Sequence, residues 1–281
     1  MKAADQILVK LSSTIATAFF VAMILAGACT LSLETAAAQS ANHKATKANT
    51  KTVKKEVPSD VPMPFHVGET LKYQVAWATF TTAAAVQLSV KERRDLFGWG
   101  TWHFQAFAHT VSPVRSLFSI DDQFDSYTDA ASLESRQYEM YLNEMGKKQD
   151  RVIHLLPTGQ SPRGDVPRVV VLPGTRDPLG ALYALRGVNW QKTPDFRTPV
   201  YDGRDVYELR AHLVTADEAV AVVAGKYSAS RLSIHLFQHE KEVSGMSFSA
   251  WLAHDSARTP VLMQADLPFG NLRVELTSAT Q

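Results

Sequence analysis

The histidines are the first side chains in this chain that could hold a metal ion. His235 and His239 are four positions apart, and on a helix this spacing would bring both rings to one side. Their surroundings alternate in hydrophobicity as strands do, and four residues of a strand span about 13 Å. Two rings so far apart cannot both reach one ion at about 2 Å. We interpret them, together with His103 and His109 on the polar side of another expected strand, as surface histidines.

Four aspartates within nine residues form the densest acidic cluster. Carboxylate oxygens at this density suit calcium, but the segment lacks the glycine and the closing glutamate of a calcium-binding hand. Phe124 and Tyr127 lie among the aspartates, so a strand with a solvated acidic face is the favoured interpretation. The four residues are Asp121, Asp122, Asp125 and Asp129.

Asp255 lies in a short polar segment between Trp251 and Arg258, and as chemistry it would be a candidate general base. We favour a structural role, in which Asp255 makes an Asx-type turn of a hairpin and pairs with Arg258. Asp177 and Arg186 are likewise expected to serve as a helix cap and in a charge pair. The sequence contains no nucleophile elbow, phosphate loop or dinucleotide fingerprint. We therefore predict a non-catalytic protein without catalytic residue, metal site or cofactor.

Strands must position most of these side chains, because apolar and polar residues alternate along much of the chain. Such alternation predicts strands with one buried face. Together with few helical stretches, it predicts a mainly β fold: a single curled antiparallel sheet, half-barrel or barrel-like, with one or two short helices. The clearest alternation covers 71–77, 86–90, 232–236, 246–252 and 272–276, and further strand-like runs lie near 100–111, 134–143, 148–156, 167–172 and 205–214.

One segment has helical spacing instead. Asp177 is a good N-cap, Pro178 suits the first helical position, and Gly187 is expected to be the C-cap. A second short helix is expected around 114–118. A lone helix beside a curved sheet usually covers the apolar side of the curl.

The N-terminus predicts export from the cytoplasm. Residues 11–33 carry no charge, and small residues before position 39 suit cleavage by signal peptidase after Ala38. Two alternatives stay open: lipidation at Cys29, which lies in a lipoprotein-like box, and an uncleaved membrane anchor. All three place the protein in the periplasm or cell envelope, with a membrane contact only through the lipid or the uncleaved signal.

The remaining chain divides into a polar tether and one domain. Residues 39–64 lack aromatic side chains and cannot bury enough apolar surface to order, whereas 65–281 form the β-rich domain. Cys29 is the single cysteine, so the domain has no disulfide. The net charge of +1 argues against a nucleic-acid partner.

A set of landmarks in a fixed order extends over residues 65 to 277. Through these residues the chain resembles the bacterial family called domain of unknown function 3108. The resemblance implies an exported β-rich domain similar to the half-barrel of periplasmic lipoprotein carriers, and it supplies no catalytic or binding residues. The chain departs from the family at Ala83–Ala85, where members tend to carry a glycine. The landmarks are Phe65 to Tyr73, Trp77, Asp177 to Leu179, Leu185, Arg186, Trp251, Asp255, Arg258, Pro260, Val261, Phe269, Gly270, Glu275 and Leu276.

The interior of the curled sheet is the expected functional region. We predict that bulky side chains on its concave side form an apolar groove for lipid or lipoprotein acyl chains. The alternative is a structural or interaction module, with a filled core and a surface that docks another envelope protein. A continuous apolar cavity would favour the groove, and a fully packed interior the module. The candidate groove residues are Trp77, Phe104, Ile234 and Phe248.

Overall fold

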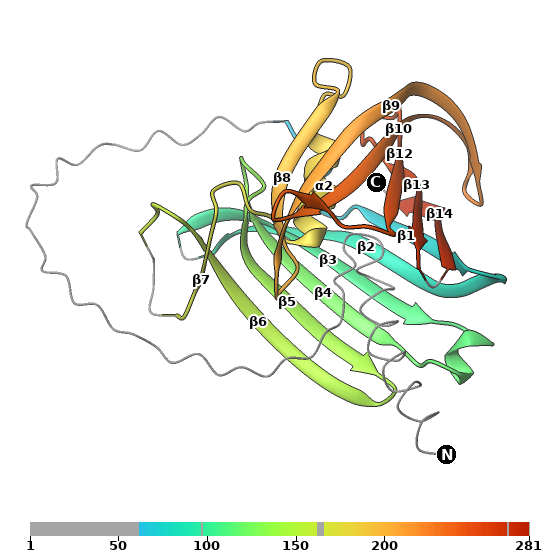
Figure 1. Ribbon diagram of the computed structural model, residues 1–281, viewed down its shortest axis with the longest axis horizontal. Coiled ribbons are helices and arrows are strands. Elements are labelled where there is room, and N and C mark those ends of the chain that lie inside the picture. The colour runs from blue at the N-terminus through green and yellow to red at the C-terminus, as the bar shows by residue number, and fades with distance from the viewer. Residues whose placement is uncertain (1–61, 97, 162–165, 269, 281) are drawn as a thin grey trace, which may run out of the picture.

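The computed structural model describes residues 62–96, 98–161, 166–268 and 270–280 (Figure 1). The expected signal segment, with Ala38 and Cys29, and residues 39–61 of the expected tether lie outside these ranges. Within them the strands pair in one large curled sheet, which confirms the mainly β prediction. The strands are β1 (Thr70–Trp77), β2 (Phe80–Leu96), β3 (Trp99–Thr110), β4 (Asp121–Asp129), β5 (Ser135–Glu144), β6 (Lys147–Pro157), β7 (Val169–Val171), β8 (Asp195–Tyr201), β9 (Val206–Val222), β10 (Gly225–Gln238), β11 (Lys241–Glu242), β12 (Ser247–Ala253), β13 (Pro260–Leu267) and β14 (Gly270–Thr280).

The strand order is β7-β6-β5-β4-β3-β2-β1-β14-β13-β12-β10-β9-β8, with β11 paired to β10. Neighbouring strands are antiparallel except β6 and β7, which run parallel. The alternation found in the sequence places one side-chain row inside the curl, where Leu71, Tyr73 and Val75 of β1 are buried. The first strand and the last strand therefore lie side by side in the middle of the sheet.

The two ends of the sheet approach each other through a short connecting segment, residues 172–177, which we call the strap. The backbone N–H of Arg176 donates to the carbonyl of Pro199 in β8 at 3.0 Å, and the carbonyl of Thr175 accepts from the N–H of Ser135 in β5 at 3.0 Å. Arg151 of β6 also donates to the carbonyl of Gly203, in the β8–β9 turn, at 2.6 Å. The strap thus joins strands from opposite ends of the sheet where no continuous ladder does.

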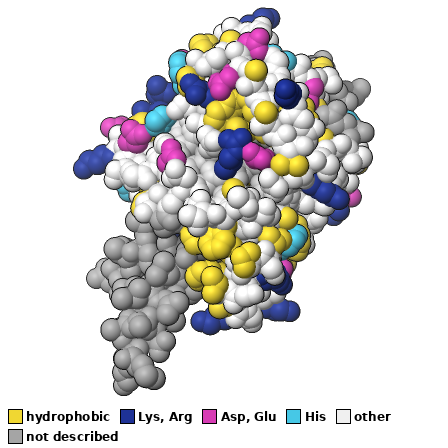
Figure 2. Space-filling view, turned by 90° about the vertical axis from the view of Figure 1, so that its right-hand side faces the viewer, with side chains coloured by type: hydrophobic (Ala, Val, Ile, Leu, Met, Phe, Trp, Pro, Cys, Tyr) yellow, Lys and Arg dark blue, Asp and Glu magenta, His cyan; other side chains and the backbone are white. Residues whose placement is uncertain are grey.

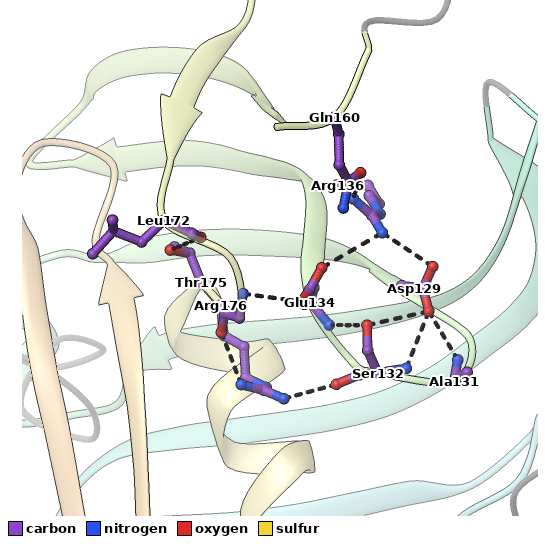
Figure 3. A network of polar contacts seen from close by, with 10 residues as sticks. Asp129, Ala131, Ser132, Glu134, Arg136, Gln160, Leu172, Thr175 and Arg176 are labelled. Atoms are coloured by element: carbon purple, nitrogen blue, oxygen red, sulfur yellow. Dashed lines mark hydrogen bonds and ion pairs between the residues drawn. The ribbon is translucent and has the colours of Figure 1, made fainter. Parts of the chain in front are cut away.

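Polar side chains attach the strap to the β4–β5 turn (Figure 3). The Glu134 carboxylate accepts from the N–H of Gly174 at 2.9 Å, and Arg176 donates to the carbonyl of Ser132 at 2.7 Å. Arg136 donates to Asp129 at 3.2 Å and so holds the base of the same turn. The network fixes the direction in which the chain enters the helix that follows.

The helix α2 (Pro178–Gly187) begins where the sequence predicts and lies against the inner face of the sheet (Figure 1). The Asp177 carboxylate accepts from the N–H of Gly180 at 2.9 Å and from the hydroxyls of Ser126 and Ser135 at 2.5 Å each. The last helical residue is Gly187, so the predicted C-cap at Gly187 is one residue early and Val188 is the C-cap. The second predicted helix is a single 3₁₀ turn, η1 (Val114–Ser116).

A buried ion pair holds the C-terminal turn of α2. Arg186 donates to both oxygens of Glu69, at 2.7 and 2.6 Å, and to the carbonyl of Ala257 at 2.8 Å. The side chains of Arg186 and Glu69 are only 1% and 0% exposed. The expected charge pair of Arg186 therefore exists, and it joins α2 to the residue that precedes β1.

The predicted hairpin turn at Asp255 is present, since the N–H of Arg258 donates to the Asp255 carbonyl at 3.2 Å. It is not the predicted Asx turn, because the Asp255 side chain accepts from a residue four positions on, and the predicted pairing of that side chain with Arg258 is also wrong. Asp255 accepts from the N–H and the hydroxyl of Thr259, at 2.9 and 2.6 Å. Arg258 donates instead to the carbonyls of Arg186 and Val188, at 3.0 and 2.8 Å. The last carbonyls of a helix have no partner within the helix and attract cations. The Arg258 guanidinium therefore binds these carbonyls and not the Asp255 carboxylate.

Candidate functional site

An apolar recess of the described domain lies between α2 and the inner face of β9, β10, β12, β13 and β14. Short side chains create the space: Ala181 of α2 faces Ala250 of β12 and Ala265 of β13. Larger apolar side chains such as Phe248 and Met263 complete the lining, and Ser249 and Gln264 are its polar members. Since no ionisable side chain belongs to this lining, the recess offers apolar contact but no acid–base chemistry.

The recess is small. Its volume is about 30 Å³, which is room for about two water molecules. Pockets that enclose small-molecule ligands usually have volumes of about 300 Å³ or more. As the domain stands, a methyl group fits the recess and an acyl chain does not.

The structure places the four candidate groove residues in three different surroundings. Ile234 and Phe248 are cross-strand partners and both line the recess. Phe104 is fully buried, with its ring 3.8 Å from that of Tyr183 in the packing between α2 and the sheet. Trp77 is half-buried, pairs with the recess residue Leu272 of β14 without lining the recess itself, and stacks on Phe80.

The residues that line the recess from the helix side were not predicted from the sequence. Ala181, Leu182 and Leu185 face it from α2, and Leu209 faces it from β9. The helical spacing of the leucines was visible in the sequence, but it gave no sign of which strands they would meet. The small side chains of Ala250 in β12 and Ala265 in β13 were the available signal for an unfilled space.

The acidic cluster lies on β4 as expected, but the prediction of a solvated face is wrong. Asp122 and Asp125 are 1% and 3% exposed. Asp125 accepts hydrogen bonds from His103 at 2.6 Å, Gln105 at 3.0 Å and Gln123 at 2.7 Å. Burial by itself would raise the pKa of Asp125, but these hydrogen bonds hold it below the usual value. Neighbouring polar side chains on the sheet have replaced water around the carboxylate.

His103 corrects a second expectation, since its side chain is only 12% exposed. Its ring stacks on that of Tyr127 at 4.4 Å and binds Asp125, so it is a half-buried structural residue and not a surface histidine. His109 is also half-buried, beside Phe107. His235 is more exposed and contacts Glu242 at 2.6 Å. Among the described residues, no three His, Cys, Asp or Glu side chains are grouped as a metal site requires.

Asp122 accepts from the N–H of Asn143 at 2.9 Å, where the β4–β5 ladder ends. Burial raises the pKa of Asp122 to about 6. Burial, and secondly the Asp122 charge, raise the pKa of Glu144 to about 7. Both values exceed those of unfolded chains, so these carboxyls stabilise the fold fully only at low pH and lose that contribution as pH rises through 6 and 7.

We expect Asp122→Asn to remove part of this pH dependence. The amide oxygen can still accept from Asn143, while the ionisation that disfavours the fold is gone. We compare the change in the free energy of unfolding between pH 4 and pH 7. This change should be more favourable to the fold by about 2 kcal/mol in Asp122→Asn than in the unmodified protein. Urea unfolding between pH 4 and 8 measures this. Asp150→Asn, an exposed position, is the control, and equal pH slopes for the two variants would contradict the assignment.

Residues 72–277 match the family described as Protein of unknown function (DUF3108), which is well over half of the chain. The chain belongs to the DUF3108 family. No curated protein matches the DUF3108 chain. Within the described ranges, no helix is both long and apolar enough to cross a membrane.

Several solved structures are similar to the DUF3108 chain at low sequence identity. A beta-barrel-like protein of the DUF1849 family from Brucella abortus has 11% identity and a TM-score of 0.45, over 76% of this chain and 97% of that one. A protein with YmcC-like fold from Bacteroides fragilis, itself suggested to be exported, has 9% identity and a TM-score of 0.36, over 78% and 98%. A suggested lipoprotein from Parabacteroides distasonis has 9% identity and a TM-score of 0.35, over 78% and 97%.

Four charged residues among those that carried the resemblance to DUF3108 lie around α2: Glu69, Asp177, Arg186 and Arg258. Asp177 caps the helix, Glu69 binds Arg186, and Arg258 binds the carbonyls at the helix C-terminus. Each of these charged side chains has a structural partner. In this DUF3108 domain the shared pattern therefore describes how the helix is fixed inside the sheet.

Proposed function

We propose that the domain is a non-catalytic module of the cell envelope with a filled interior, which acts through its outer surface. The observation that carries this proposal is the recess volume of about 30 Å³ inside the curl. The aromatic packing of Phe65, Phe104 and Tyr183 between α2 and the sheet supports it, because these rings occupy the space that a ligand would need. The lining of the recess also lacks the titratable groups that catalysis uses.

Location in the envelope is part of the same proposal and comes from the sequence. The uncharged residues 11–33 and the small residues before position 39 form an export signal in each of the three processing schemes. The periplasmic or envelope compartment follows from that signal.

A carrier of lipid or lipoprotein acyl chains is the second candidate. It is favoured by the apolar lining that Ile234 and Phe248 share beneath α2. For this function α2 would have to move away from β12 and β13, because a pocket of about 300 Å³ is needed for a ligand of that class.

Native mass spectrometry of the mature protein, purified from its own envelope fraction, decides between the two. We expect the mass of the chain with no bound lipid and no uptake of an added fluorescent fatty acid, because the interior is already filled. Co-purifying lipid that is bound in the recess would contradict the filled-interior proposal. The same spectrum reports whether the chain begins at Gln39 or at a lipidated Cys29.

Two variants make the result specific. If lipid is found, Ile234→Asp should abolish lipid binding only if the lipid lies in the recess. Val214→Asp, on the exposed part of β9, is the matched control because this valine is 46% exposed. Thermal unfolding of both variants shows that the fold has been kept.

A further inference from the structure

Two apolar side chains project from adjacent turns at one end of the sheet. Leu117, after η1 in the β3–β4 connection, is 59% exposed, and Met145, in the β5–β6 turn, is 52% exposed. The turns are bound together, since the N–H of Met145 donates to the carbonyl of Ser119 at 2.7 Å and the N–H of Ser119 contacts the Met145 sulfur at 3.3 Å. Leu117 and Met145 thus belong to one ordered tip, which we call the apolar tip.

The backbone at Met145 shows that an apolar side chain is not the conformationally easy choice there. Glu144 pairs with Lys147, so Met145 and Gly146 form a two-residue hairpin turn, and their φ angles are +51° and +76°. Turns with two positive φ values favour asparagine followed by glycine. A methionine at the first position is strained and solvent-exposed at once, which indicates a role outside the fold.

Positive charge lies beside the apolar tip. Lys147 and Lys148 follow the Met145–Gly146 turn and are exposed. Arg115 lies two residues before Leu117, where it binds Asp121 at 2.8 Å. The nearest acid on β5, Glu144, is partly neutral at pH 7 because burial raises its pKa to about 7. Figure 2, which views the side at the right of Figure 1, shows hydrophobic side chains gathered in its lower half with Lys and Arg side chains beneath them.

We propose that the apolar tip docks the domain on an anionic lipid bilayer, with Leu117 and Met145 in the interface and Lys147 and Lys148 on the headgroups. Apolar residues beside lysines are the combination that binds anionic membrane surfaces. The α2 helix and Phe65 lie towards the opposite end of the sheet, so docking leaves the packed interior undisturbed. This inference is therefore independent of whether the recess holds a ligand.

Flotation of the mature protein with vesicles tests the proposal, using phosphatidylcholine alone and phosphatidylcholine with phosphatidylglycerol. We expect binding to the anionic vesicles, weakened by added salt. Replacing Lys147 and Lys148 by alanine should lower the partition coefficient about fivefold for each lysine. Leu117→Ser should lower it about tenfold. Val223→Ser, at the tip of the β9–β10 hairpin and 57% exposed, is the matched control and should change nothing.

Met145→Asn separates docking from folding. Asparagine suits the positive φ, so we expect the thermal midpoint to be unchanged or higher while vesicle binding falls. A lower midpoint with unchanged binding would show that Met145 serves the fold alone and would overturn its assignment to the docking surface.

A fluorescent label separates docking by the tip from attraction through the N-terminal lysines. In a chain with Cys29→Ser, an environment-sensitive dye attached at Leu117→Cys should shift to the blue on anionic vesicles. The same dye at Val223→Cys should not. Vesicle binding without a shift at position 117, or with equal shifts at both positions, would overturn the proposal.

Discussion

Replacing Arg186 by methionine should destabilise the domain by about 3–5 kcal/mol, because it leaves the Glu69 carboxylate buried without a partner. Glu69 is 0% exposed and receives two hydrogen bonds from Arg186. The carbonyl of Ala257 would lose its donor as well. Urea unfolding followed by tryptophan fluorescence gives the change in the free energy of unfolding.

The double variant Glu69→Leu with Arg186→Met tests whether the loss in Arg186→Met comes from the unpaired Glu69 carboxylate. Apolar residues of similar volume often replace a buried ion pair at little cost, so the double variant should be more stable than Arg186→Met. Arg204→Met is the matched surface control, since Arg204 and Asp205 pair at 3.5 Å with side chains 69% and 43% exposed. A loss in Arg186→Met no larger than in Arg204→Met would contradict the assigned role of the buried pair.

Replacing Asp177 by alanine should cost about 3 kcal/mol, which combines the loss of an N-cap with the loss of buried hydrogen-bond partners. Gly180 loses the acceptor of its N–H, and the hydroxyls of Ser126 and Ser135 lose theirs. Asp177→Asn should cost less, because the amide oxygen can still accept from Gly180. Thermal unfolding measures both losses.

Hydrogen exchange identifies the backbone amides that lose protection in Asp177→Ala. Because the strap and α2 share this residue, amides of 172–187 should lose protection in Asp177→Ala before those of β13 and β14. Asp195→Ala provides the comparison at an aspartate whose side chain is 69% exposed. Uniform loss of protection across the sheet would contradict a local cap.

The fold class followed from the sequence because alternation along a strand is a local property. Three strands were not predicted, and one of them, β11, has only two residues. The other two do not show the simple alternation. β13 is buried on both faces over Pro260–Met263 and therefore does not alternate, and β8 contains Pro199 at the edge of the sheet. The distal parts of β9 and β10 are polar and exposed, so their full lengths were also hidden.

The partners of charged side chains were less predictable, because they depend on contacts distant in sequence. Asp177 was identified as a cap from its local pattern. Glu69 and Arg186 are 117 residues apart, and nothing local indicated that they meet. Asp125 was expected in water because aspartate usually is, whereas three donors from β3 and β4 make its burial tolerable.

The pairing of β1 with β14 affects how the chain reaches its native state. Synthesis releases β1 before β14, so the middle of the sheet cannot close until β14 has been made. Contacts of such long sequence separation slow folding, and unpaired strand edges expose newly made chains to aggregation. We therefore expect the emerging polypeptide to depend on a chaperone that shields the β1 edge until its C-terminal partner arrives.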